Sequence, residues 1–421
     1  MPTQELLRDE PHHPEPLEQT GCMTYKFFDN DDFQFRVELA LGSVSYGVGD
    51  VGEILATIEH ITDGSDKEWF EAFLALGQRI EAIADTCAAV GDEVSARDAY
   101  LRASTYYSYA SEAVQGLDDD SQLVPTFTAH RRCWDEFARR WEPALEHVAI
   151  PYETATMPGY FLKVDDSGAA RPTVILANGS DGPITWLWMV GLAALHRGYN
   201  ALIFDGPGQQ SMLFVNDVPF RPDWENVITP VIDWLLTRSD VDRGKLVLYG
   251  VSQAGYWVPR ALAFEHRLAA AIADPGVVDV STAFNSHVPD FLLDMLKAGN
   301  ADDFNQFMTP TLEESPEQRR MWTFRSRPYG GGTPYAVYSA VQQYNVRSVA
   351  DKVTTPILIC DPEGEQCWPG QAEELFGLLP GPKELVKFTA AEGADRHCQP
   401  LARKLTDQRM FDWLTTVLDA K

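Results

Sequence analysis

Hydrophobic residues in the first third of the chain recur every three or four positions, which is the spacing of an amphipathic helix. Four segments carry this pattern: residues 40–60, 68–90, 93–114 and 127–141. Only one pair of these segments resembles a helical repeat module, and one pair is too few for a repeat array. The pattern therefore predicts one helical domain over residues 25–142. Residues 1–24, which are rich in Pro, Glu and His, are expected to be disordered.

After about residue 145 the pattern changes to short apolar segments that alternate with helical ones. A hairpin is predicted first, over residues 148–152 and 159–163. Six apolar strands and a closing helix follow: 172–177, 201–204, 245–249, 270–273, 356–360, 385–388 and helix 401–418. Strands that are apolar on both faces are typical of a parallel sheet covered by helices on both sides. We therefore predict an α/β domain over residues 143–421, with a mostly parallel, doubly wound sheet.

One connection in this domain is too long for a simple crossover. It joins the strand that ends near Asp274 to the strand that begins near Pro356, and it is rich in aromatic residues and methionine. We expect an inserted lid over about residues 279–345, with Gly330, Gly331 and Gly332 as a flexible joint.

The amino-acid composition limits the classes of binding partner and the cellular location that we expect. With 34 basic and 62 acidic residues the net charge is −28, which argues against nucleic acid and anionic membranes as partners. No apolar run approaches the ~18 residues of a membrane span, and no signal peptide is visible at the start. The six cysteines form no C-x-x-C pair, so reduced thiols and a cytoplasmic location are expected. His12 and His13 have no further ligands nearby, so no metal site is expected.

The most informative motif follows the strand at 245–249. Gly250 to Gly255 reads GVSQAG, a G-x-S-x-G sequence between an apolar strand and a helical segment. That context resembles the nucleophile elbow of α/β-hydrolases, where a sharp turn exposes the serine above the sheet edge. Ser252 is therefore the candidate nucleophile, and the helix that follows it favours developing negative charge.

A serine hydroxyl needs a base, and α/β-hydrolases order their triad as serine, acid, histidine. His397 lies after the last strand and before the closing helix, as this order requires. His266 and His287 do not fit the order. The acid belongs in the turn after the strand at 356–360, where three carboxylates compete. Glu365 is preferred by its distance from the strand, with Asp361 and then Glu363 as alternatives.

The oxyanion of an acyl-transfer intermediate needs two fixed N–H donors. The backbone N–H of Gln253, directly after the nucleophile, is the first candidate. The loop at residues 178–182, which follows the strand at 172–177, occupies the position of the second donor in α/β-hydrolases. We nominate the N–H of Ser180 there.

Several motifs together indicate a narrower family. GSDG at 179–182, DGPGQ at 205–209, GVSQAGYW at 250–257, DPEGEQCWPGQ at 361–371 and FTAAEGADRHCQ at 388–399 follow an N-terminal helical region. The chain resembles the fungal polyketide-shortening pigment hydrolases and the bacterial 2,6-dihydroxypseudooxynicotine hydrolase. The resemblance implies cleavage of a carbon–carbon bond next to a ketone, a homodimer, and N-terminal helices that help to cover the active site. The chain departs from these relatives at Glu365, where they commonly have aspartate, and at Cys367, where an aromatic residue is more usual.

The expected function is therefore that of a serine hydrolase acting on a small ketone or ester through an acyl-enzyme, without a metal or organic cofactor. An esterase or acyltransferase with the same triad is the alternative enzyme. A non-catalytic binding protein is the alternative from another class. A peptidase of the prolyl-oligopeptidase kind is disfavoured, because it would bring a β-propeller instead of helices.

Overall fold

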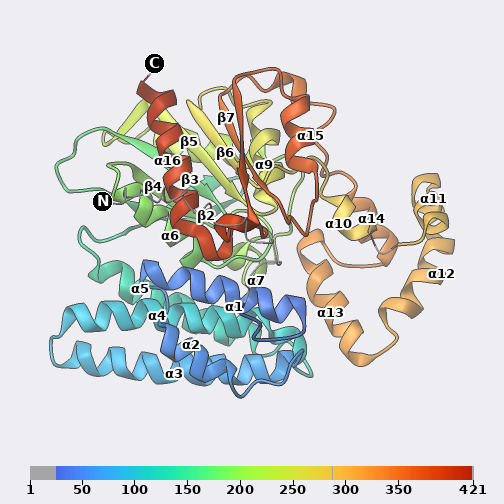
Figure 1. Ribbon diagram of the computed structural model, residues 1–421, viewed down its shortest axis with the longest axis horizontal. Helices are drawn as coiled ribbons and strands as arrows, with labels where there is room; N and C mark the ends of the chain where they lie inside the picture. The colour runs from blue at the N-terminus through green and yellow to red at the C-terminus, as the bar shows by residue number, and fades with distance from the viewer. Residues whose placement is uncertain (1–24, 287, 420–421) are drawn as a thin grey trace, which may run out of the picture.

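The computed structural model describes residues 25–286 and 288–419 and consists of one sheet covered by helices (Figure 1). Residues 1–24, for which we expect disorder, lie outside the described residues, as does His287. Five helices form a layer below the sheet in Figure 1, called here the helical layer: α1 (Asp31–Ser43), α2 (Val51–Ile58), α3 (Asp66–Ala89), α4 (Glu93–Glu112) and α5 (Leu123–Arg140).

The single helix predicted over residues 40–60 is wrong, because the chain turns between α1 and α2. A short 3-10 turn after α1 leads into Gly47, whose φ is +77°. Only glycine adopts this left-handed conformation at little cost. Asp50 then begins α2 by accepting hydrogen bonds from the backbone N–H groups of Gly52 and Glu53. The hydrophobic spacing continues across the turn, which is why the pattern alone missed it.

Eight strands form one sheet in the order β1-β2-β4-β3-β5-β6-β7-β8. The strands β3 to β8 pair in parallel, while β1 and β2 form an antiparallel hairpin and β2 also pairs antiparallel with β4. Their bounds are β1 Glu146–Tyr152, β2 Ala155–Leu162, β3 Arg171–Ala177, β4 Asn200–Phe204, β5 Val241–Val251, β6 Ala270–Asp274, β7 Ile357–Pro362 and β8 Lys383–Phe388. The predicted α/β-hydrolase fold with a mostly parallel sheet is confirmed.

Helices cover both faces of the sheet. On one face α6 (Ile184–Leu195) and α16 (Arg403–Asp419) share a hydrophobic core with the helical layer. Trp188 of α6 shows how close this contact is, because its ring lies edge-on to Phe137 and Trp141 with centroids 4.9 and 4.7 Å away. On the other face α8 (Glu225–Leu235), α9 (Ala254–Leu262) and α15 (Gln371–Leu378) form a second core. The short helix α7 (Gln210–Phe214) follows β4.

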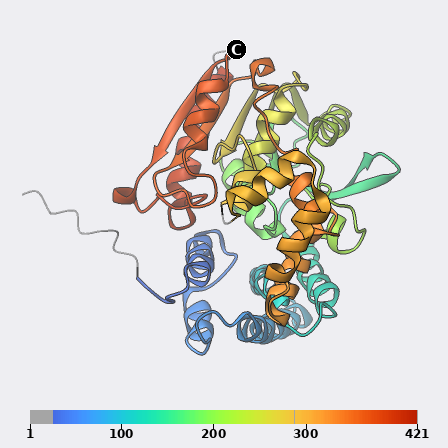
Figure 2. The ribbon, with the colours of Figure 1, turned by 90° about the vertical axis from the view of Figure 1, so that its right-hand side faces the viewer.

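The connection between β6 and β7 is helical, and we keep the name lid for residues 279–345. It contains α10 (Ser281–Asn285), α11 (Asp290–Ala298), α12 (Ala301–Leu312), α13 (Pro316–Ser326) and α14 (Pro334–Val341). Figure 1 shows α11 and α12 projecting away from the sheet and α13 returning toward the helical layer, and Figure 2 shows the same helices from their own side. Gly330, Gly331 and Gly332 all have positive φ. The domain limits at 25–142, 143–421 and 279–345 stay predictions.

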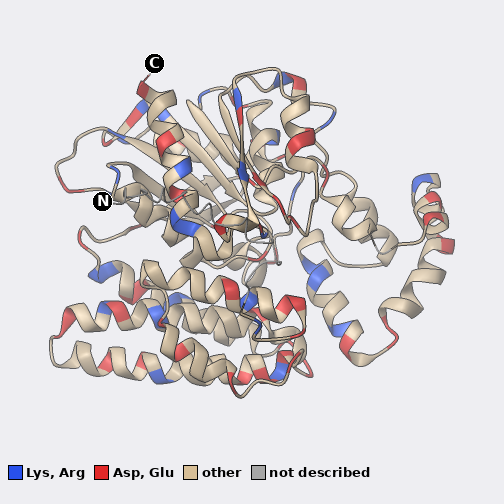
Figure 3. Ribbon diagram, in the orientation of Figure 1, with Lys and Arg blue, Asp and Glu red and all other residues tan. Residues whose placement is uncertain are grey.

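Charged residues are concentrated on the outer helices and loops, and the central strands carry few (Figure 3). In the part of the chain that the structure describes, no helix has both the length and the apolar character to cross a membrane.

Candidate active site

The turn after β5 holds Ser252 in a left-handed backbone conformation, with φ +58°. Its N–H donates a hydrogen bond of 2.7 Å to the carbonyl oxygen of Asp274 at the end of β6. Gly255 is required by close packing, since a Cβ there would lie 1.8 Å from the carbonyl oxygen of Pro275. A Cβ at Gly250 would likewise lie 2.6 Å from a methyl group of Val258. The strand–turn–helix that the motif predicts is therefore present.

The structure brings Ser252, His397 and Glu365 into one hydrogen-bonded chain. The Oγ of Ser252 lies 2.9 Å from Nε2 of His397. The other ring nitrogen, Nδ1, lies 2.8 and 2.9 Å from the two carboxylate oxygens of Glu365. A carboxylate only accepts, so Nδ1 carries the proton and Nε2 presents its lone pair to the serine hydroxyl. This is the geometry of a base poised to activate a nucleophile.

Of the three carboxylates left open by the sequence, only Glu365 faces His397. It also accepts hydrogen bonds from the N–H groups of Cys367 and Trp368, 2.9 and 3.1 Å long. Asp361 instead lies 3.2 Å from Nζ of Lys387. Glu363 accepts a hydrogen bond from a backbone N–H after β8. Both alternative carboxylates therefore bind partners other than His397.

Burial and charge act in opposite directions on this pair. Burial disfavours the protonated imidazole, but the charge of Glu365 and its hydrogen bond outweigh burial and raise the pKa of His397 above its ordinary value. Burial likewise disfavours the carboxylate, yet the charge of His397 and the bonds at its oxygens lower the pKa of Glu365. The lowered pKa keeps Glu365 ionised near neutral pH, with its charge beside the imidazole of His397.

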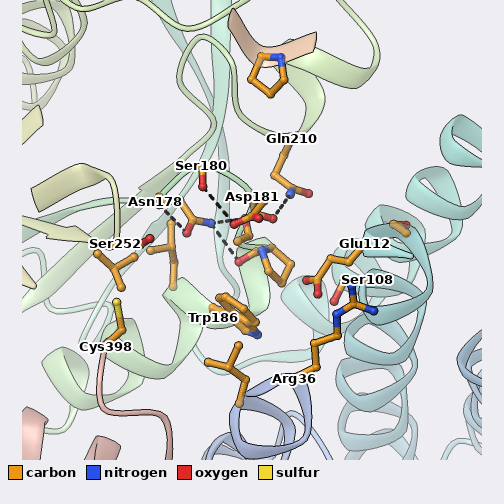
Figure 4. Close-up of a pocket in the computed structure, with 18 of the residues that line it drawn as sticks. Arg36, Ser108, Glu112, Asn178, Ser180, Asp181, Trp186, Gln210, Ser252 and Cys398 are labelled. Atoms are coloured by element: carbon orange, nitrogen blue, oxygen red, sulfur yellow. Dashed lines mark hydrogen bonds between the residues drawn. The ribbon is translucent and has the colours of Figure 1, made fainter. Parts of the chain in front are cut away.

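The loop after β3 lies directly against the nucleophile. A Cβ at Gly179 would lie 2.7 Å from Cβ of Ser252, so glycine is needed for this approach. The N–H of Gly179 is already used, because it donates to the side chain of Asn178 over 2.9 Å. Among the described contacts the N–H groups of Ser180 and Gln253 donate to no protein group. Figure 4 shows Ser180 and Ser252 on the same side of the cavity.

A cavity of about 360 Å³ opens beside Ser252, within the size range of small-molecule sites. Trp186 lines it, whereas Trp188 on the same helix is fully buried in the core. The lid forms its roof through α13 and the turn after it. There Tyr329 donates a hydrogen bond of 2.8 Å to the side chain of Gln253, and Arg325 lies 3.5 Å from Asp181.

The helical layer supplies the opposite wall of the cavity, as the family resemblance leads us to expect, but sequence reasoning named none of the residues that line it. Arg36 of α1, Ser108 and Glu112 of α4, and Phe127 and His130 of α5 line it. The available signal was the position of Ser108 and Glu112 four residues apart on α4, since that spacing aligns two polar groups on one helix face. Most of the surrounding residues of α4 are buried.

Glu365, Cys367 and His397 are the one group of potential metal ligands found among the described residues, with donor atoms within 4.8 Å of one another. Both ring nitrogens of His397 already have partners, Glu365 and Ser252.

The chain is similar in sequence to known fungal hydrolases. No family model matches the chain. The chain is 28% identical over 426 residues to hydrolase acrC of Aspergillus aculeatus. The alignment covers 94% of this chain and 99% of that protein. It is 27% identical over 415 residues to 20-hydroxy-prefusarin hydrolase FUS2 of Gibberella moniliformis, with the same two shares of 94% and 99%.

Among solved structures, the crystal structure of 2,6-dihydroxy-pseudo-oxynicotine hydrolase superposes with a TM-score of 0.67 at 21% identity, covering 90% of this chain and 96% of that one. AbyA5 superposes with a TM-score of 0.60 at 15% identity, covering 93% and 99%. These likenesses show a common fold that includes the helical layer. The chain thus has the α/β-hydrolase fold and is similar to the fungal hydrolases and to 2,6-dihydroxy-pseudo-oxynicotine hydrolase, as its motifs predict.

Proposed function

We propose that the protein is a serine hydrolase that cleaves a carbon–carbon bond next to a ketone, or an ester, in a polyketide-like or aryl-ketone small molecule. The observation that carries the proposal is the hydrogen-bonded chain from Ser252 through His397 to Glu365 beside a small-molecule cavity. Two similar proteins are hydrolases of 20-hydroxy-prefusarin and of 2,6-dihydroxy-pseudo-oxynicotine, which supports a small oxygenated organic substrate.

The first half of the reaction forms an acyl-enzyme. The Oγ of Ser252 attacks the substrate carbonyl carbon while Nε2 of His397 accepts the hydroxyl proton. The carbonyl oxygen becomes an oxyanion, for which the N–H groups of Ser180 and Gln253 are the proposed donors. When the intermediate collapses, the bond to the leaving carbon breaks with its electron pair, and the leaving group takes the proton from His397.

The second half releases the acid. Water attacks the acyl carbon, His397 accepts its proton, and the bond between the acyl carbon and Oγ breaks as Ser252 regains a proton. Carbon–carbon cleavage requires a leaving carbanion that is delocalised, so β-diketones and electron-rich aryl ketones are the substrates of choice. An ester needs no such delocalisation, because its leaving group is an alkoxide.

Kinetics of Ser252→Ala test the proposal. We expect turnover of a reactive ester, p-nitrophenyl butyrate, and of an aryl β-diketone to fall by about 10³-fold or more. Ser95→Ala is the matched control, because Ser95 is exposed on α4, and it should retain wild-type rates. Near-normal turnover by Ser252→Ala on both substrates contradicts the mechanism.

Isotopic water separates hydrolysis from acyl transfer, the alternative that uses the same triad. In H₂¹⁸O a hydrolase places one ¹⁸O atom in the carboxylic acid product. A product ester or amide without the label would instead identify an acyltransferase. The homodimer implied by the family resemblance also stays a prediction, and light scattering of the purified chain tests it.

A further inference from the structure

The cavity continues beyond the nucleophile to a second polar region on the helical layer. In Figure 4 Trp186 lies between Ser252 on one side and Glu112, Ser108 and Arg36 on the other. We call five of the polar lining residues on the helical layer the distal wall: Arg36, Ser108, Ser111, Glu112 and His130. None of them belongs to the triad or to the proposed oxyanion site.

His130 presents an unused hydrogen-bond acceptor in this wall. Its side chain is buried, with 1% of the residue exposed. Nδ1 lies 2.8 Å from the carbonyl oxygen of Ser104, so Nδ1 carries the proton. Nε2 is buried and has no partner. Burial, and next to it the charge of Arg131, lower the pKa of His130 to about 3, so the ring is neutral and Nε2 keeps a free lone pair.

Glu112 presents a second unused group. Its Oε1 atom is buried without a partner, and in Figure 4 the carboxyl group points into the cavity. Burial and the charge of Asp181 raise the pKa of Glu112 to about 8, against Arg36 and Arg325, which lower it. Arg36 is engaged elsewhere, because it lies 2.7 Å from Asp66 and packs over the ring of Phe33. A neutral carboxyl group donates one hydrogen bond and accepts another.

Two buried polar groups without partners in one cavity indicate a ligand that supplies the partners. The group that matches both is a hydroxyl, which donates to Nε2 of His130 or to the carboxyl of Glu112 and also accepts. The space before the distal wall is lined by Phe127, Trp186 and Phe214, side chains whose flat faces suit a ring.

We propose that Glu112 and His130 form a specificity subsite for hydroxyl groups on a ring, at the end of the substrate remote from Ser252. This deepens the proposed function, on which it rests only for the position of the reacting carbonyl. The substrate class is then a hydroxylated aromatic or polyketide ring that carries a ketone or ester side chain.

Binding to the Ser252→Ala protein tests the subsite without turnover. The probes are 2-acetylnaphthalene and its 6-hydroxy and 7-hydroxy derivatives, titrated by their fluorescence. At least one hydroxylated probe should bind 10-fold or more tightly than 2-acetylnaphthalene. Adding Glu112→Leu should reduce this preference to within twofold and leave the affinity for 2-acetylnaphthalene unchanged within twofold. Adding His130→Phe should weaken the hydroxylated probe at least fivefold.

Two further variants keep the test sharp. Glu112→Gln retains a donor and an acceptor, so it should retain most of the preference even where Glu112→Leu fails to fold. Glu71→Leu replaces an exposed glutamate of α3 and should change nothing. Equal affinity for all probes, binding of none of them, or an equal loss for all probes in Glu112→Gln overturns the subsite. Failure of hydrolysis by the wild-type protein would refute the proposed function and leave this binding result standing.

Discussion

At the scale of single residues, the identity of the triad acid was the open point, and the contacts of Glu365 favour it over its neighbours. Glutamate has one methylene more than the aspartate that the family resemblance leads us to expect at this position. The two N–H groups of Cys367 and Trp368 that bind Oε1 hold the longer side chain in place. These backbone donors therefore help to direct the carboxylate of Glu365 toward His397.

The first prediction concerns this carboxylate. Glu365→Gln keeps the size of the side chain but removes the charge that stabilises the imidazolium, so kcat should fall by about 10³- to 10⁴-fold. Glu363→Gln, in the same turn, should remain within twofold of the wild type. Steady-state rates and thermal unfolding of both variants check the prediction. An equal fall in the two variants would show that the turn, and not the acid, had been damaged.

The second prediction concerns the stability cost of Glu112. Its carboxyl keeps its proton up to a pKa of about 8 in the folded chain, whereas an unfolded glutamate loses it near pH 4.5. The unfolded state therefore binds fewer protons between these values, and the contribution of Glu112 to stability falls as pH rises through this window. Glu112→Gln, which cannot ionise, should gain stability relative to the wild type on going from pH 4.5 to pH 8.

Urea unfolding at the two pH values measures this difference. The comparison is with Glu71→Gln, an exposed site where the gain should be absent. A stability difference between Glu112→Gln and the wild type that stays constant from pH 4.5 to pH 8 would mean that Glu112 ionises normally in the folded chain.

At the scale of elements, one buried cluster holds the nucleophile turn and the histidine loop together. Nη1 of Arg403, at the start of α16, lies 3.1 Å from Asp274 and donates over 2.7 Å to the carbonyl oxygen of Cys398, next to His397. The backbone carbonyl of Asp274 in turn accepts the N–H of Ser252. The side chains of Arg403 and Asp274 are only 6% and 0% exposed, so neither charge has water as a substitute partner.

Loss of Arg403 should therefore be costly. Arg403→Leu leaves Asp274 buried and uncompensated, which we expect to destabilise the fold by about 3–5 kcal/mol. The double variant Asp274→Asn with Arg403→Leu removes both charges and should recover part of that loss. Chemical denaturation of the single and double variants gives the two values. A double variant no more stable than Arg403→Leu would refute the role of the paired charges.

Elements differ in how far the sequence predicts them. The parallel strands were found because buried strands are apolar on both faces, a property that each segment carries by itself. The break between α1 and α2 was missed because it depends on the conformation of Gly47. Ser252, His397 and Glu365 were predicted to lie together because their order along the chain follows the fold. Glu112 and His130 were not, because only packing of the helical layer brings them to the cavity.

At the scale of the whole molecule, the helical layer is part of the enzyme's core and of its active site. Its aromatic residues share one hydrophobic cluster with a face of the sheet. Its first helix also touches the histidine loop, since Glu38 lies 3.1 Å from Arg396. A Cβ at Gly42 of α1 would lie 1.8 Å from the carbonyl oxygen of Pro400. The layer thus forms one wall of the cavity and packs against the loop that carries His397.

A chain shortened to residues 143–421 should therefore fail to form a stable protein. Deleting the helical layer exposes the apolar face around Trp188, a residue that is fully buried in the intact chain. We expect aggregation, or loss of the cooperative unfolding transition in circular dichroism. A soluble shortened chain with cooperative unfolding and unchanged ester hydrolysis would show that the helical layer is dispensable.

We propose that His397 activates Ser252 as a nucleophile, and covalent labelling measures this activation directly. The intact mass of the protein is recorded after incubation with diisopropyl fluorophosphate, and the modified peptide is sequenced by mass spectrometry. We expect a single adduct on Ser252 in the wild type, none in Ser252→Ala, and labelling slowed by at least 10²-fold in His397→Ala. Equal labelling of wild type and Ser252→Ala, or an adduct on another residue, would contradict it.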